Sequence, residues 1–400
     1  MTPPRVVLVT RRFWPLFGGP EVMMARLAAG LERSGVRTTV VTAKWQQDWP
    51  DEFEHHGARV VRLEPPGARW WAAAAYIARL RRWLLANRAS FDVAYVSGLR
   101  HEAYATLLAG RRAGFPVILR AEQAGLSGDC RWQLDARFGR TIKQLCRRAA
   151  AIVVPTPLVE REVIAAGYPR ERIRAIPLGV PELPCPEPDA RLEARRALAA
   201  SQRRLAVPDA APLAVFAGRL VESKGLLDLI EAWPAVLQRV PAAHLWLVGE
   251  GPQAARLAAE IERRVLASRV TLAGAFDDVE DCLCAADLFV VAARDDGGVL
   301  ALLEAMSLGL PVVATDTAAH RAVIENGQHG RLVPIGQPRA LADAIADLCC
   351  PSDEATRLGR EARQRVTREF SFDRCLDRHL ALLAEVHARS TAATQAAPVP

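Results

Sequence analysis

The sequence predicts an α/β protein made of two doubly wound parallel-sheet domains that face a central cleft. Its 400 residues exceed what a single hydrophobic core usually organises. Short apolar runs such as Val6–Val9 alternate with helical segments, which is typical of parallel strands buried on both faces. The segment 181–188 separates two such series, and its four prolines exclude a continuous helix or an inner strand.

The first series begins with the strand at Val6–Val9. A loop that ends in Gly18-Gly19 leads from it into a helix over 20–34, whose first turn holds Pro20 and Glu21, both favourable at a helix start. Further strands are expected at 38–42, 60–63, 93–97, 117–120 and 152–155. We place the first domain at 1–185.

The second series follows a helix expected over 189–204, and we place its domain at 186–370. Its strands are expected at 213–217, 244–248, 270–272, 288–291 and 312–314, and its helices at 338–349 and 353–368. A last helix over 373–388 carries Leu376, Leu380 and Leu383 on one face, and residues 389–400 are expected to be a disordered tail.

Charge and composition exclude several kinds of function. The net charge of +7 comes almost entirely from arginine, and pairs such as Arg147-Arg148 suit a phosphorylated ligand or an anionic membrane surface. No recognition-helix, zinc-finger or RNA-binding signature is present, so nucleic acid is not an expected partner. The 8 cysteines include no C-x-x-C pair and no histidine at ligand spacing, so we expect neither a metal site nor a disulfide.

No apolar run reaches the roughly 18 residues of a membrane-spanning helix, and no basic leader with an apolar core opens the chain. A cytoplasmic protein is therefore expected. The basic and aromatic segment 69–85 leaves two interpretations open. It is either a helix that rests on an anionic membrane at its inner face or a domain helix with a buried apolar side.

A basic pair follows the strand at 213–217. Arg219 comes directly after it, and Lys224-Gly225 precedes an amphipathic helix expected over 226–233. A guanidinium fork, an ammonium group and the N–H groups of a helix start together suit a diphosphate. The alternative is two solvated charges at a strand end.

Two carboxylates, Asp296 and Glu304, stand eight positions apart, shortly before the apolar run Gly309-Leu-Pro-Val-Val313. With the basic pair, this set resembles the nucleotide-binding half of the retaining glycosyltransferases of family 4 (glycosyl transferases group 1), which have the GT-B fold of two Rossmann-like domains. The resemblance covers nearly the whole chain, sharply in the second domain and loosely in the first. It implies that the helix over 373–388 packs back on the first domain.

The resemblance assigns roles to individual residues. Arg219 and Lys224 would stabilise the leaving diphosphate, and Glu304 would accept hydrogen bonds from the ribose hydroxyls. Asp296 stands where the family has a glutamate that contacts the transferred sugar, and this change puts the choice of donor in doubt. The remaining donor-binding candidates are backbone groups or loop residues: Gly18, Gly19, Glu250, Gly297, Gly298, Val299 and Leu300.

Some of these residues have structural alternatives. Glu304 would equally suit the charged start of a helix over 301–308, and Gly18-Gly19 an ordinary turn. Glu122 takes the place of the family's histidine beside the reacting sugar. It suits either a hydrogen bond to a sugar hydroxyl, with a share in guiding the acceptor proton, or a structural position at a strand end.

The resemblance implies a retaining transferase that moves a sugar from a nucleotide-diphosphate sugar to a hydroxyl acceptor, without a metal or other cofactor. The acceptor would be a sugar or a lipid-linked molecule of cell-envelope, exopolysaccharide or glycolipid synthesis. Two alternatives stay open. The first is a catalytically silent relative that binds a sugar or a nucleotide, and the second is another enzyme of the same architecture, such as a nucleotide-sugar epimerase or a phosphorylase.

Overall fold

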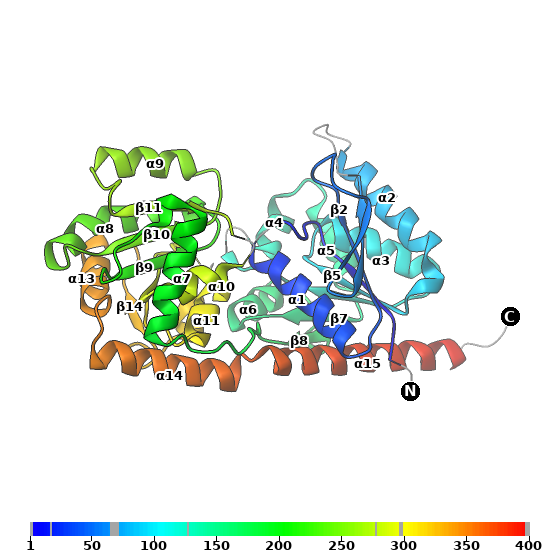
Figure 1. Cartoon of the computed structure of the whole chain (residues 1–400). Coiled ribbons are helices and arrows are strands. Elements are labelled where there is room, and N and C mark those ends of the chain that lie inside the picture. The colour runs from blue at the N-terminus through cyan, green and yellow to red at the C-terminus, as the bar shows by residue number, and fades with distance from the viewer. Residues whose placement is uncertain are drawn as a thin grey trace. The chain divides into compact units, whose positions relative to one another are not determined.

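The computed structural model describes residues 3–16, 18–64, 72–125, 128–276, 278–295 and 299–396. The chain divides into two compact units (Figure 1). Unit 1 comprises Met1–Gly179 with Asp373–Pro400, and unit 2 comprises Val180–Phe372. The boundary between the units falls before residue 185, where we expected the first domain to end. Residues 180–183 belong to unit 2 because they form hydrogen bonds with it. The Val180 N–H donates to the Phe370 carbonyl, and the Ser307 hydroxyl donates to the Pro181 carbonyl.

Unit 1 contains an eight-stranded sheet in the order β3-β4-β2-β1-β5-β6-β7-β8, parallel except for β3. The order reverses at β1, which pairs with β2 on one side and β5 on the other. The strands are β1 (Val6–Val9), β2 (Thr38–Ala43), β3 (Glu52–His55), β4 (Ala58–Leu63), β5 (Val93–Ser97), β6 (Val117–Arg120), β7 (Ala151–Val154) and β8 (Ile173–Ala175). Its helices are α1 (Gly19–Arg33), α2 (Ala72–Ala86), α3 (His101–Ala113), α4 (Asp129–Asp135), α5 (Gly139–Cys146), α6 (Pro157–Ala165) and α15 (Phe372–Ala396).

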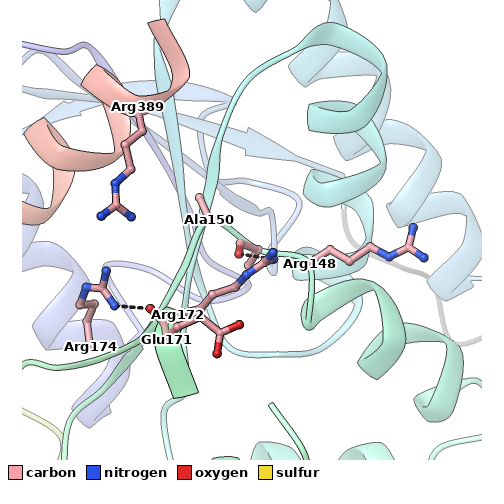
Figure 2. A pocket seen from close by; sticks show the side chains of 7 residues that line it. Arg148, Ala150, Glu171, Arg172, Arg174 and Arg389 are labelled. Carbon is pink, nitrogen blue, oxygen red and sulfur yellow. Dashed lines mark hydrogen bonds between the residues drawn. The ribbon is translucent and has the colours of Figure 1, made fainter. Parts of the chain in front are cut away.

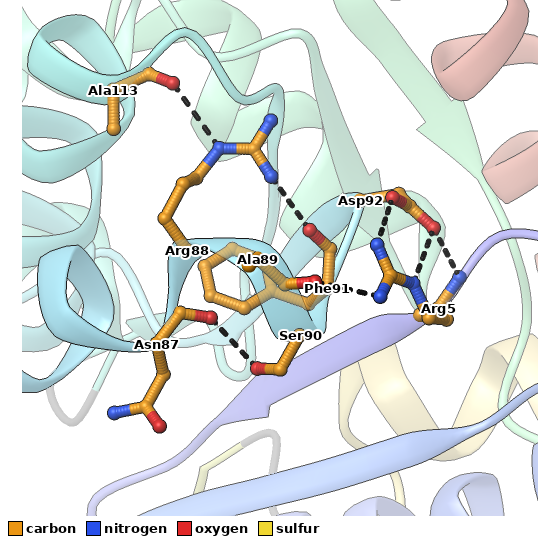
Figure 3. A network of polar contacts seen from close by, with 8 residues as sticks. All are labelled: Arg5, Asn87, Arg88, Ala89, Ser90, Phe91, Asp92 and Ala113. Carbon is orange, nitrogen blue, oxygen red and sulfur yellow. Dashed lines mark hydrogen bonds and ion pairs between the residues drawn. The ribbon is translucent and has the colours of Figure 1, made fainter.

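An arginine–aspartate pair fixes the amino ends of the two central strands (Figure 3). The Arg5 guanidinium donates to the Asp92 carboxylate at 2.9 and 3.2 Å, and the Arg5 backbone N–H donates to the same group at 2.8 Å. Arg88 closes the adjacent turn by donating to the carbonyls of Phe91 and Ala113. These contacts hold the amino end of β1 against that of β5.

The helix α2 is a domain helix in its described part. Its side chains Tyr76, Leu80 and Leu84 recur every four residues and are buried in the core of unit 1, beside α3 (Figure 1). This geometry favours the second of the two interpretations of 69–85. Residues 65–71, with the basic and aromatic start of that segment, lie outside the described residues.

Unit 2 contains a six-stranded parallel sheet in the order β11-β10-β9-β12-β13-β14. Its core includes the fully buried Trp233 and Trp246. The strands are β9 (Leu213–Ala217), β10 (His244–Val248), β11 (Val270–Gly274), β12 (Leu288–Val291), β13 (Val312–Thr315) and β14 (Arg331–Val333). The helices are α7 (Pro188–Ser201), α8 (Leu226–Arg239), α9 (Ala254–Arg263), α10 (Val279–Cys284), α11 (Val299–Ser307), α12 (Ala318–Val323), α13 (Pro338–Leu348) and α14 (Asp353–Glu369).

The end of the chain corrects one expectation. Helix α15 continues to Ala396, so most of the segment 389–400 that we expected to be disordered is helical. Alanines at 392, 393 and 396 favour a helix, and Arg389 pairs with Glu385 one turn earlier at 2.8 Å. Within the described part of the chain, none of the helices combines the length and the apolar character that spanning a membrane requires.

Candidate functional site

The strand order of unit 2 places its candidate site at the carboxyl ends of β9 and β12. The order reverses at β9, which pairs with β10 on one side and β12 on the other. In doubly wound sheets ligands bind at this switch point. The loop after β9 carries Arg219 and Lys224, and the loop after β12 carries Arg294 and Asp295.

Hydrogen bonds join these two loops. The Arg294 N–H donates to the Ser223 carbonyl at 2.7 Å. The Arg294 guanidinium forms a two-pronged ion pair with Asp228, in the first turn of α8, at 2.9 and 2.5 Å. The start of α8 is thereby held at the switch point, where its free N–H groups can meet an anion.

Gly225 allows the loops to approach this closely. Its φ is +62°, and a Cβ placed there would lie 1.9 Å from the Ala292 carbonyl oxygen. A side chain at this position would therefore meet both an unfavourable backbone conformation and a rigid neighbour. The glycine lets Lys224 and the start of α8 lie against the end of β12.

Replacing Gly225 by alanine is expected to lower the free energy of unfolding by about 3 kcal/mol, because the left-handed conformation and the clash both act against it. Gly336 provides a matched control. Its φ is +70°, and nothing lies within 4 Å of a Cβ placed there. Gly336→Ala is expected to cost only about 1 kcal/mol. Urea unfolding of both variants measures the difference, and equal losses would contradict the close approach.

The turn after β10 borders the same edge of the sheet. The Leu220 N–H donates to the Glu250 carbonyl at 2.8 Å, and the Gln253 N–H donates to the Leu220 carbonyl at 3.1 Å. A Cβ at Gly251 would lie 2.3 Å from the Leu220 oxygen, so this glycine is also needed for close contact. The Glu250 side chain is exposed, as a candidate for nucleotide binding requires.

Arg219 and Lys224 are cations with few local partners. Arg219 is exposed and Lys224 is half-buried. Within the described residues, neither side chain forms a hydrogen bond or an ion pair with another group. Burial lowers the pKa of Lys224 to about 8, the charge of Asp295 acts in the opposite direction, and that of Arg219 adds to the lowering. The positive charge at this edge is thus available to a ligand.

The start of α11 contributes backbone groups more than side chains. Val299 and Leu300 are buried, so their side chains belong to the core and only their backbone can offer polar contacts. Glu304 lies further along α11 and is only 8% exposed, which is unusual for a carboxylate. The other members of this loop that we selected, Asp296, Gly297 and Gly298, lie outside the described residues.

In unit 1, Gly18 and Gly19 lie at the corresponding edge of the sheet. Gly18 is the residue before α1, its carbonyl accepts from the Val22 N–H, and Gly19 is the first residue of the helix. The helix follows β1, where the strand order reverses. The two glycines therefore lie at the switch point of unit 1, and their part in donor binding stays a prediction.

Glu122 follows β6 and is held by three neighbours. The Ser97 hydroxyl donates to its carboxylate at 2.6 Å, and its own N–H donates to the Asp129 carboxylate at 2.8 Å. The Arg120 guanidinium lies 3.7 Å away. Burial raises the pKa of Glu122, and the charge of Arg120 and the bond from Ser97 oppose this rise.

Two members of this group, Asp129 and Ser97, could not be predicted from the sequence. Asp129 is buried and also accepts from the Arg100 guanidinium at 2.9 Å, so it joins the loops that follow β5 and β6. Ser97 ends β5. The only local signal was an aspartate at the start of a short helix, which is common at helix starts of any kind.

Two family models match the chain in sequence. The model described as "Glycosyl transferase 4-like domain" matches residues 18–179, and that described as "Glycosyl transferases group 1" matches residues 211–350. The two matches cover most of the chain, and each falls on one of the α/β units.

Individual relatives agree with these matches. The lipopolysaccharide core biosynthesis glycosyltransferase LpsE of Rhizobium meliloti is 32% identical over 189 residues, which are 47% of this chain and about half (54%) of that relative. A GDP-mannose-dependent alpha-(1-6)-phosphatidylinositol monomannoside mannosyltransferase of Mycobacterium tuberculosis is 25% identical over 393 residues, 92% of this chain and 95% of the other. The crystal structure of Anabaena HepE with UDP and glucose has the same fold, with a TM-score of 0.77 at 19% identity over 96% of this chain and 100% of that one.

The fold, the matches and the relatives define a glycosyltransferase with the GT-B fold. The chain belongs to the family 4, or group 1, glycosyltransferases.

Proposed function

We propose that this protein is a retaining glycosyltransferase that moves a sugar from a nucleotide-diphosphate sugar to a hydroxyl group of a sugar or lipid-linked acceptor. The observation that carries the proposal is the pair Arg219 and Lys224 at the switch point of unit 2. Neither side chain forms a hydrogen bond or an ion pair with a described residue, and Lys224 lies directly before the start of α8. A diphosphate supplies the negative charge that this arrangement favours.

The proposed reaction exchanges one bond at the anomeric carbon for another. The bond from that carbon to the diphosphate oxygen breaks, and the acceptor oxygen forms a new bond on the same face of the sugar. The departing diphosphate takes the acceptor proton. Negative charge grows on the diphosphate as the bond breaks, so Arg219 and Lys224 would stabilise the transition state more than the bound donor.

The remaining candidates would position the substrates. Glu304 would accept hydrogen bonds from the ribose, and Asp296 with the backbone of 297–300 would hold the transferred sugar. Glu122 would bind a sugar hydroxyl on the acceptor side. The relatives suggest the kind of product, since those reported above act in lipopolysaccharide core biosynthesis or on a phosphatidylinositol mannoside. We infer a role in cell-envelope or exopolysaccharide synthesis, at the inner face of the plasma membrane.

Calorimetric titration with UDP, GDP, ADP and TDP tests the donor site and identifies the base. Binding of one nucleotide, followed by turnover of its sugar derivatives with acceptor extracts, would support the proposal. Binding without any turnover would instead favour a catalytically silent relative, which Asp296, Gly298 and the missing family histidine suggest. Product analysis separates transfer from epimerisation.

Transfer is expected to continue at an unchanged rate in EDTA, because two side-chain cations and a helix start would balance the charge of the leaving group without a metal ion. The measurement compares initial rates in EDTA and in Mg²⁺. A complete loss of activity in EDTA that Mg²⁺ restores would contradict metal independence.

A further inference from the structure

A second cationic site lies in unit 1, at the edge of the sheet opposite Glu122. A cavity of about 500 Å³ opens there among four arginines, Arg148, Arg172, Arg174 and Arg389 (Figure 2). This volume falls within the roughly 300–1,000 Å³ of small-molecule sites. Arg148 precedes β7, Arg172 precedes β8 and Arg174 lies within it. The cavity is thus at the amino ends of the strands, whereas Glu122 follows the carboxyl end of β6.

Two of the arginines converge on a single carboxylate. The guanidinium groups of Arg174 and Arg389 form ion pairs with the same oxygen of Glu385, at 3.0 and 2.8 Å. Arg174 comes from β8, whereas Arg389 and Glu385 come from α15. Figure 2 shows the two guanidinium groups turned toward each other. The other amino group of Arg174 donates to the backbone carbonyls of Glu171 and Ile173, at 2.8 and 3.1 Å. Each fork offers five N–H groups, so donors remain on both arginines after these contacts.

Backbone carbonyls hold the third arginine in place. One amino group of Arg172 donates to the carbonyls of Ala149 and Arg147, at 3.0 and 3.2 Å. This leaves the rest of its planar fork free for a ligand. The Arg148 side chain has no hydrogen bond or ion pair with any residue in the described part of the chain, and its guanidinium points away from those of the other three arginines (Figure 2).

The charges do not balance within the cavity. Four arginines line it, and the carboxylates of Glu171 and Glu385 are the acidic groups that the described residues place beside it. An excess of positive charge therefore remains in one concave place. Arginine forks bind phosphate oxygens in pairs, which makes a phosphate group the anion that fits this arrangement best.

We propose that this cavity is a phosphate-binding site, separate from the nucleotide-sugar site of unit 2. Arg172, Arg174 and Arg389 hold the phosphate oxygens, and Arg148 adds positive charge at the rim. The ligand is a phosphate monoester or diphosphate group, carried by a soluble metabolite or by a lipid headgroup. Because Arg389 comes from α15 and the others from the sheet edge, the bound anion also fastens α15 to β8. This site does not depend on the proposed glycosyl transfer.

The test uses inorganic pyrophosphate and the full chain carrying Arg219→Ala and Lys224→Ala, so that the unit 2 site does not contribute. Calorimetry at constant ionic strength is expected to give one bound pyrophosphate per chain. Adding Arg174→Gln and Arg389→Gln is expected to weaken binding at least tenfold. The control pair, Arg59→Gln and Arg131→Gln, removes the same charge from exposed ion pairs elsewhere in unit 1 and is expected to change affinity less than twofold.

Vesicles distinguish the two sources of phosphate. Binding to phosphatidic acid vesicles, but not to phosphatidylcholine vesicles, with loss in the Arg174→Gln, Arg389→Gln variant, would identify a lipid headgroup. Binding of pyrophosphate alone would identify a soluble ligand. If the control variant Arg59→Gln, Arg131→Gln loses as much affinity as Arg174→Gln, Arg389→Gln, the binding reflects the net charge of the protein. That result would overturn the proposal. The absence of binding to either probe would also overturn it.

Discussion

Replacing both Arg219 and Lys224 by alanine is expected to lower kcat/KM for the donor by about four orders of magnitude. Loss of a single group that stabilises developing negative charge typically costs about 10²–10³ in rate, and two such groups are removed here. Each single variant is expected to lose about 10². Because neither side chain is bonded to another described residue, the fold of unit 2 should persist. Steady-state kinetics and urea unfolding of the same preparations provide the measurements.

The control is a pair of arginines in unit 2 whose charges are already satisfied. Arg239 pairs with Asp347 at 2.7 Å, and Arg263 pairs with Glu260 at 2.5 Å. Replacing both by alanine removes the same charge from exposed positions and should leave the rate within twofold. If the Arg219, Lys224 variant loses less than tenfold, the leaving group is stabilised by other residues. If it no longer folds, the comparison has to use Arg219→Gln and Lys224→Gln.

The central strands of both sheets could be predicted from the sequence because burial on both faces leaves a simple signature. Strands such as Val93–Ser97 and Leu213–Ala217 are almost wholly apolar, and the structure confirms their positions. The edge strands have no such signature. In β3, Glu52–His55, exposed and partly buried residues alternate, and β8 is only three residues long. Tertiary pairing defines these strands, so the local sequence did not predict them.

Helix limits were less predictable where neighbouring elements decide them. We expected the helix after Lys224 over 226–233, and the next residue, Pro234, lacks a backbone donor. The helix instead continues to Arg239. Val236, one turn after Trp233, is fully buried, and this packing outweighs the cost of the proline. Local sequence indicates where a helix is weak, but burial against the sheet determines whether it ends.

In the candidate site too, local patterns could be predicted from the sequence and contacts between distant residues could not. Arg219 and Lys224 could be selected because a basic pair beside a strand end is a local pattern. Their surroundings could not, because the partners come from distant parts of the chain. Arg294 and Asp228 are separated by 66 positions, and together they hold the start of α8 in place. Similarly, nothing in the sequence near Glu122 points to Ser97, which lies 25 positions earlier.

The affinity for a nucleoside diphosphate is expected to fall as the pH rises above 8, because Lys224 must be charged to bind it. Burial lowers the pKa of the free lysine to about 8, and a bound diphosphate would raise it again. Between pH 7.5 and 9.5 the protonated fraction of such a group falls by about 20-fold, and affinity should fall with it. The phosphate groups themselves are fully ionised in this range, since their last pKa is about 6.

The stability of the free protein should change in the opposite direction. Between pH 8 and the ordinary pKa of lysine, the unfolded chain binds the proton more tightly than the folded chain, so the contribution of Lys224 to the free energy of unfolding rises with pH. Lys224→Arg separates charge from titration, because a guanidinium stays protonated throughout. Its calorimetric affinity is expected to be independent of pH between 7.5 and 9.5. A wild-type profile as flat as that of Lys224→Arg would show that Lys224 does not bind the diphosphate as a cation.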